Sequence, residues 1–231
     1  MTLTSSRLTA AAGACAVVAG ALYAVVQINH PAADLDHITT LDFRVREIAK
    51  MTMAALTIAG LTGMLVRNRH RFGALGTVGY VLVVIGYFAM FANQVIVACV
   101  LPTLSRTDPG YVQAYLDAAL GKTSGAELGA VQTLFMVTGM GYSIGGLVFG
   151  IALLRAGILS RWASLLFSYG TVSALALAVL PQSFSRPFAI PVSIALVGLG
   201  YSLWRNRVET TTTAATRSVA TGTGSYEPVS R

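Results

Sequence analysis

The chain has few charged residues for its length. Asp, Glu, Lys and Arg together make up 11% of its 231 residues, whereas a soluble globular domain has about 25%. The hydrophobic residues, 55% of the total, are gathered into long runs. These features exclude an ordinary soluble domain and are typical of a protein embedded in a membrane.

Six hydrophobic runs are long enough to cross a membrane as helices. A transmembrane helix needs about 20 residues to span roughly 30 Å of hydrocarbon. Strands of a membrane barrel would alternate between apolar and polar residues, which these runs do not. We therefore expect an all-α, polytopic bundle in one domain (1–207), with six transmembrane helices at about 9–28, 46–66, 73–101, 127–154, 158–180 and 187–204.

Cysteine and histidine are scarce, which excludes several kinds of site. Cys15 and Cys99 lie inside expected helices without a CxxC pattern, so neither a disulfide scaffold nor a zinc motif is expected. The three histidines are too few for a membrane di-iron enzyme, and the expected helices contain no pair of them to bind haem. No carboxylate falls near mid-membrane, where a proton-coupled transporter would normally place one. The sequence therefore predicts no cofactor.

Basic charge comes almost entirely from arginine and is unevenly distributed. Lys50 and Lys122 are the only lysines, which is typical of a GC-rich bacterial genome. If the helices alternate in direction, one side carries short arginine-rich turns such as RNRHR (67–71), and the other carries every acidic residue outside the C-terminal tail. By the positive-inside rule, both termini are predicted to be cytoplasmic in a multi-pass protein of the bacterial cytoplasmic membrane. Membrane lipid is the expected partner, and nucleic acid is not.

The two ends of the chain differ from the hydrophobic runs between them. The first run follows Arg7 as a secretory signal would, but it is too long for the apolar region of a signal. The sequence around Tyr23 is also a poor cleavage context, so we expect a retained helix. Residues 208–231 are rich in Thr, Ser and Gly without an apolar period, which predicts a disordered cytoplasmic tail.

Polar side chains are concentrated at the outer ends of the expected helices. Ionisable and amide groups are costly to place at membrane depth and are therefore functional candidates. The inner two-thirds of the bundle has little besides Ser, Thr and Tyr as polar residues. The outer polar layer consists of Gln27, Asn29, Glu47, Lys50, Asn93, Gln94, Glu127, Gln132, Gln182 and Arg186.

The second expected helix carries the strongest candidates in this layer. Its apolar run, 51–66, is short for a membrane, so the preceding turn with Glu47 and Lys50 must enter the outer boundary. Residues three or four positions apart meet on a helix face, which allows the pairs Glu47–Lys50 and Asp42–Arg46. Two interpretations stay open: boundary salt bridges, or a partly buried acid or base at Glu47 that Lys50 tunes.

Asn93 and Gln94 are the amide candidates on the third expected helix. Neighbouring positions on a helix are about 100° apart, so only one of these two side chains can point optimally into the bundle. That side chain either makes an interhelical hydrogen bond or orients a ligand.

The first outer loop, HPAADLDH (30–37), contains enough nitrogen and oxygen ligands for a zinc or manganese ion. Those ligands are His30, Asp34, Asp36 and His37. However, proline and aspartate also form turns, and acids just before a helix favour its N-terminus. We therefore predict no metal site and keep His30, Asp34 and His37 as the alternative.

Two stretches of the chain resemble a family of small bacterial integral-membrane proteins that have about six helices and no known function. The stretches are RLTAAAGACAVVAGALYAVVQINHP (7–31) and GLVFGIALLRAGILSRWASLLFSYG (146–170). This resemblance implies a layout and no activity. A looser likeness is to small integral-membrane terpene cyclases, which use acidic side chains near one membrane face to protonate an isoprenoid epoxide or alkene.

The likeness to terpene cyclases implies that Glu47, Asp42 or Glu127 supplies the proton. The chain departs from those cyclases in two respects, because it has fewer helices and lacks two acids well inside facing helices. We predict an integral membrane protein that handles a lipophilic small molecule at an outer-leaflet polar pocket. It would act as a cofactor-free cyclase or isomerase with Glu47 as proton donor. Candidate substrate contacts are Lys50, Asn93, Gln94 and Gln132.

Two other functions remain open from the sequence. The alternative is a non-catalytic accessory or assembly subunit that is recognised through its outer loops, and the third is a small transporter.

Overall fold

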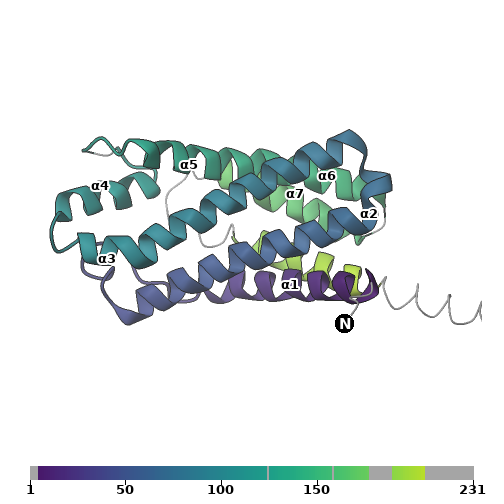
Figure 1. The fold of residues 1–231 in the computed structure, drawn as a ribbon, viewed down its shortest axis with the longest axis horizontal. Helices are drawn as coiled ribbons and strands as arrows, with labels where there is room; N and C mark the ends of the chain where they lie inside the picture. Colours follow the sequence, from purple (N-terminus) through teal and green to yellow (C-terminus); the bar gives the residue numbers. More distant parts are fainter. Residues whose placement is uncertain (1–4, 124, 158, 177–188, 206–231) are drawn as a thin grey trace, which may run out of the picture.

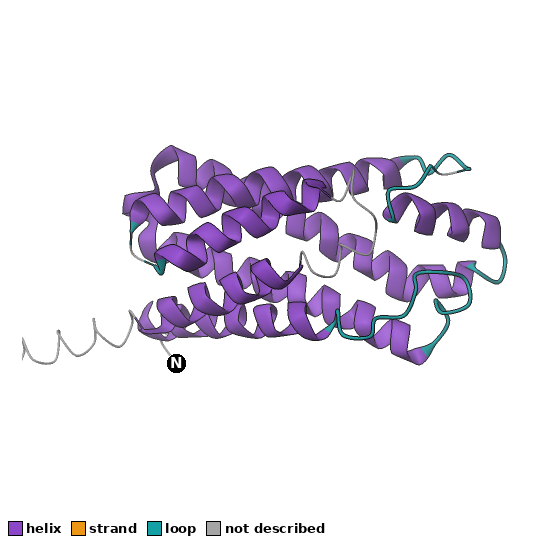
Figure 2. Ribbon diagram, turned by 180° about the vertical axis from the view of Figure 1, so that it is seen from behind, coloured by secondary structure: helices purple, strands orange, loops and turns teal. Residues whose placement is uncertain are grey.

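The structure, a computed structural model, describes residues 5–123, 125–157, 159–176 and 189–205. All regular structure in these ranges is helical (Figure 2), which confirms the predicted all-α class. Three helical segments are long and apolar enough to cross a membrane: Ser6–Val25, Leu41–Leu104 and Ala130–Ala156. The predicted tail, 208–231, lies outside the described residues, as do Gln182 and Arg186.

The longest helix is folded back on itself. Helix α1 (Ser5–Val25) leads through a loop into α2 (Leu41–Val95), which bends sharply at Gly73 (Figure 1). Gly73 has φ 57° and ψ −162°, a conformation nearly restricted to glycine. Helix α2 therefore supplies two arms where the sequence predicts separate helices. The first arm continues beyond the apolar run through RNRHR, because hydropathy marks a membrane boundary and not the end of backbone hydrogen bonding.

The second arm of α2 widens before it ends. It continues into a π-helix, η1 (Ile96–Val100), and then into α3 (Leu101–Leu104). The amide of Leu101 bonds the carbonyl of Ile96, five residues earlier. Pro102 accounts for this widening, because its ring crowds the carbonyl four residues before it and it has no N–H to offer.

Helix α4 (Pro109–Ala119) is a finding of the structure, since the hydropathy pattern predicts only a loop there. Asp108 begins the helix, and its Oδ1 accepts a hydrogen bond from the amide of Tyr111 at 2.9 Å. Pro109 occupies the first turn, where its missing N–H costs nothing.

The remaining helices complete the bundle. Helix α5 (Ala130–Met140), the π-helix η2 (Gly141–Gly145) and α6 (Gly146–Ala156) form one continuous segment. It begins at Ala130 and not at 127, because Gly129 has a positive φ of 53° that interrupts the helix. Helix α7 (Arg161–Ala176) packs against α6 and η2, and a last helix (Ala189–Arg205) lies against α1 and α7.

Small residues let the helices cross closely. A Cβ added at Gly60 would lie 2.8 Å from the Cβ of Ala16 on α1. One added at Gly86 would lie 2.3 Å from the amide nitrogen of Tyr142 in η2. These contacts bring each arm of α2 into backbone contact with a different neighbour.

The described residues pack into two hydrophobic cores. The larger core fills the bundle between α1, both arms of α2, α6, α7 and the last helix. The smaller core lies at one end, where α4 packs on the loop before α2 and on the turns around η1 and α3. We call this smaller core the cap; its buried members are Ile38, Phe43, Val97, Leu101, Val112, Ala114, Tyr115, Leu116 and Leu128.

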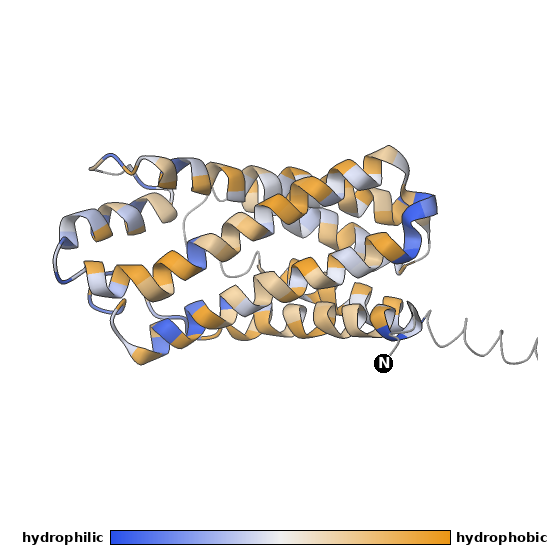
Figure 3. Ribbon diagram, in the orientation of Figure 1, coloured by the Kyte–Doolittle hydropathy of each residue, from blue (hydrophilic) through white to orange (hydrophobic). Residues whose placement is uncertain are grey.

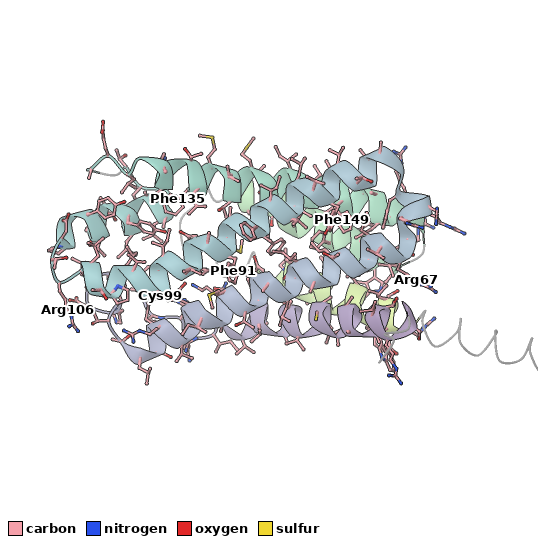
Figure 4. The ribbon with its side chains drawn as sticks, in the orientation of Figure 1. Arg67, Phe91, Cys99, Arg106, Phe135 and Phe149 are labelled. Atoms are coloured by element: carbon pink, nitrogen blue, oxygen red, sulfur yellow. The ribbon has the colours of Figure 1, made fainter. Side chains whose placement is uncertain are left out.

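The most hydrophilic residues gather at the two ends of the bundle, and the middle is mostly hydrophobic (Figure 3). All the acidic residues of the described ranges lie at the end with the cap, which we call the acidic end. They are Asp34, Asp36, Asp42, Glu47, Asp108, Asp117 and Glu127. The opposite end, the arginine end, carries Arg7, Arg67, Arg69, Arg71, Arg155, Arg161 and Arg205. Figure 4 labels Arg67 at the arginine end and Arg106 at the acidic end.

Candidate functional site

Glu47 is buried at the acidic end, in the second turn of α2. Only 2% of the residue is exposed. The Lys50 ammonium lies 2.6 Å from its Oε1, and the Nε2 of His30 lies 3.3 Å from the same oxygen. A buried carboxylate is costly unless it is paired, and here two basic groups meet it. We call these three residues the Glu47 cluster.

The contacts of His30 limit where protons can reside in the Glu47 cluster. Its Nδ1 lies 2.7 Å from the carbonyl oxygen of Pro31. A carbonyl can only accept, so Nδ1 carries a hydrogen and donates it. In a neutral ring Nε2 then has no hydrogen, so a hydrogen bond between Nε2 and Glu47 needs a further proton on Nε2 or on the carboxyl group. The pair can therefore pass a proton between a nitrogen and an oxygen.

The surroundings of His30 fix its orientation. Its side chain is 10% exposed, and its ring packs edge-on against Phe43 at a centroid distance of 5.9 Å. Phe43 is itself buried in the cap. Because the first turn of α2 and the preceding loop share this packing, the cap holds the imidazole against Glu47.

Tyr115 of α4 brings a hydroxyl group to the same region. It is completely buried and donates a hydrogen bond to Oδ1 of Asn93. Burial raises the pKa of the Tyr115 phenol, and the neighbouring Tyr111 phenol and the Glu47 carboxylate raise it further. Tyr115 therefore remains a neutral donor near the Glu47 cluster at ordinary pH.

The structure decides between the two adjacent amides. Gln94 is buried, whereas Asn93 is half-buried and accepts the hydrogen bond from Tyr115. Phe135 of α5, labelled in Figure 4, packs edge-on against the ring of Tyr115, with ring centroids 5.2 Å apart. Asn93 thus connects the second arm of α2 to the cap, and Gln94 lies inside the bundle.

Asp42 does not belong to the buried cluster. It is exposed, and both of its oxygens accept hydrogen bonds from Arg46 Nε at 3.1 Å. Arg46 also donates through Nη1 to the carbonyl of Ile28 at 2.7 Å. This pair clamps the chain that leaves α1 onto the start of α2, which is a structural task.

Glu127 and Gln132 lie apart from the Glu47 cluster as well. Both are exposed and line a groove of about 570 Å³ between the end of α4 and the start of α5. Lys122 lines the same groove, and its Nζ lies 3.4 Å from Oδ1 of Asp117. The lining of this groove includes no residue of the Glu47 cluster.

The loop ligands considered for a metal do not converge. His37 Nδ1 lies 2.7 Å from Oδ1 of Asp34, and this hydrogen bond lowers the pKa of Asp34. His30 is turned away to Glu47, and Asp36 is exposed. Within the ranges that the structure describes, no three His, Cys, Asp or Glu side chains come close enough together to hold an ion.

The sequence did not predict the roles of His30 and Tyr115 in this site. His30 appeared only as a metal ligand, and Tyr115 did not appear at all. The signal for Tyr115 is the Asp108–Pro109 helix start followed by Val112, Tyr115 and Leu116, whose spacing gives one apolar helix face. No local pattern indicates that His30 meets Glu47.

Comparison of the chain with known protein families, curated protein sequences and solved structures finds no match to any of them. The geometry of the site therefore carries the functional argument.

Proposed function

We propose that the chain forms a six-span bundle in the cytoplasmic membrane of a bacterium, with both termini on the cytoplasmic side. The separation of charge along the bundle supports this arrangement, since arginines cluster at one end and every described acid lies at the other. In this orientation the Glu47 cluster lies at the outer boundary of the membrane, beneath the cap.

We further propose that the protein handles a lipophilic small molecule at the Glu47 cluster and isomerises or cyclises it by acid–base chemistry. One observation carries this proposal: a buried carboxylate faces an imidazole nitrogen across 3.3 Å. General acid–base catalysis requires such a positioned donor and acceptor. A structural salt bridge would need only the lysine.

The proposed chemistry balances without a cofactor. The carboxyl group of Glu47 donates its proton to an alkene carbon or an epoxide oxygen of the substrate and becomes a carboxylate that Lys50 stabilises. The cationic intermediate rearranges and loses a different proton, which returns through His30 to Glu47. Asn93 and Tyr115 supply the polar contacts that orient the substrate. The product is an isomer of the substrate.

Because the product has the mass of the substrate, the test looks for a change in retention and not in mass. We would express the protein and its Glu47→Gln variant in bacterial cells and compare organic extracts by chromatography with mass spectrometry. The wild type should produce a new isomer of an endogenous lipophilic compound. Glu47→Gln should lower it by about 100-fold or more, the range of general acid catalysis.

Controls separate loss of chemistry from loss of folding. Glu127→Gln and Asp42→Asn change carboxylates outside the cluster and should leave the isomer in place. Thermal unfolding in detergent shows whether Glu47→Gln is folded. If that variant does not fold, Glu47→Asp takes its place. Glu47→Asp keeps the acidic group but moves it about one bond length back toward the helix, so it should also lower the amount of isomer. If a folded variant at Glu47 produces as much isomer as the wild type, the acid–base proposal is wrong.

A second function is favoured by the cap. Its own core extends beyond the bundle and shapes an ordered surface around α4, as an accessory subunit would need. The double variant Asp117→Lys, Lys122→Glu keeps the ion pair but exchanges the positions of its positive and negative charges on the surface. Under this second function, chemical cross-links from α4 to a partner disappear in the exchange variant, while Glu47→Gln has no effect.

A further inference from the structure

A groove runs between α1 and the first arm of α2 at the arginine end. Its volume is about 560 Å³. Most of its lining is apolar, and the side chains are small. The lining residues are Leu8, Thr9, Ala11, Ala12, Cys15, Ala59, Thr62, Gly63, Val66 and Arg67.

Close packing of the two helices forms the floor of this groove. A Cβ added at Gly63 would lie 2.1 Å from the Cβ of Ala12, so the backbones approach each other there without intervening side chains. Leu8 and Val66 stand at the rim with 54% and 64% of their surface exposed. Around them, Ala11 and Ala59 are also exposed. The opening is therefore a hydrophobic slot in a surface that faces hydrocarbon if the helices span a membrane.

The mouth of the groove is positively charged. Arg67 lines it, and Arg7, Arg69 and Arg71 are exposed at the same end of the bundle. The described residues place no acid at this end. An apolar slot that leads to a cluster of exposed arginines is complementary to a molecule with a long hydrocarbon chain and an anionic head.

We propose that this groove binds one anionic phospholipid, with an acyl chain between α1 and α2 and the phosphate at Arg67. Arginine suits this position because its planar group binds two phosphate oxygens at once. The groove is separate from the Glu47 cluster, which lies at the opposite end of the bundle. The lipid-binding proposal therefore does not depend on the proposed chemistry.

Native mass spectrometry of the full chain in detergent tests the proposal. Phosphatidylglycerol and phosphatidylcholine with identical acyl chains are added at equal concentration. The wild type should retain one phosphatidylglycerol molecule with a preference of about fivefold, the effect of one basic residue near an anionic lipid. Arg67→Gln should abolish that preference. Arg69→Gln, in the same turn but outside the groove lining, should keep it.

A second pair of variants tests the hydrocarbon part of the site. Ala59→Phe fills the groove from an exposed position and should lower the binding of both lipids. Ala55→Phe, one turn away on the same helix and outside the lining, should not. The proposal is overturned if Arg67→Gln and Arg69→Gln act alike, if Ala59→Phe binds lipid normally, or if Ala59→Phe instead dissociates a dimer of the chain.

Discussion

Glu47 owes its burial to where helix α2 begins. The helix starts at Leu41 after Thr40, whose hydroxyl accepts a hydrogen bond from the amide of Phe43 at 3.3 Å. The turn from Phe43 to Glu47 therefore places both side chains on one face, where the ring enters the cap and the carboxylate lies beneath it. Lys50 follows one turn later on the same face, which gives the buried carboxylate its partner.

Tyr115 provides a residue-scale prediction about stability and pH. Tyr115→Phe removes the hydrogen bond to Asn93 and should lower the free energy of unfolding by about 1 kcal/mol at neutral pH. The pKa of this phenol is raised above its ordinary value of 10.0. Its stabilising contribution is therefore fully present below about pH 10 and is lost as the pH rises through the raised pKa.

Thermal unfolding of wild type and Tyr115→Phe in detergent, measured between pH 7 and pH 11, checks this prediction. The difference in Tm should be constant at the lower pH values and shrink above about pH 10. Tyr111→Phe on the same helix serves as the control for a lost phenol. A difference in Tm that grows with pH would contradict the assignment of Tyr115 as a neutral donor.

At the scale of single elements, the bend in α2 determines how the bundle is connected. RNRHR and Phe72 remain helical up to Gly73, and the chain reverses direction within that residue. Lack of space does not explain the glycine, because a Cβ at Gly73 would have nothing within 4 Å. The backbone conformation alone therefore sets the requirement for glycine.

Gly73→Ala should destabilise the protein by about 1–3 kcal/mol, the cost of holding a side-chain residue in this region of φ and ψ. Gly139→Ala is the matched control, since Gly139 lies within helix α5 and a Cβ there also meets nothing within 4 Å. That change should be neutral or stabilising by up to about 1 kcal/mol, because alanine is the better helix former. Chemical denaturation in mixed micelles measures both, and equal effects would refute the argument from the bend.

Helix α4 shows what hydropathy misses. It is too short to cross a membrane, and its sequence stands out by its start, Asp108–Pro109, and by the apolar spacing of Val112, Tyr115 and Leu116. Those features are local and readable. That this face packs on η1, α3 and the loop before α2 is not readable from them, because the partners come from segments far away in the chain.

At the scale of the whole molecule, charge separation predicts an orientation in the membrane. In a background with Cys15→Ala and Cys99→Ala, Arg69→Cys should react with a membrane-impermeant maleimide only after cells are opened. Thr107→Cys, at the acidic end, should react in intact cells. This difference in labelling is expected because the positive-inside rule places the arginine end in the cytoplasm. Labelling of both positions from outside, or the reverse pattern, would contradict the proposed topology.

The sequence by itself determined the helical class, the polarity of charge along the bundle and the pairing of Glu47 with Lys50. All of these depend on hydropathy, composition or spacing within one helix, which neighbours in the chain decide. Only the tertiary structure decided that His30 meets Glu47, that Tyr115 bonds Asn93 and that Asp42 and Glu127 stay outside the cluster. Those contacts join residues of different elements, and the path of the loops and of α4 sets them.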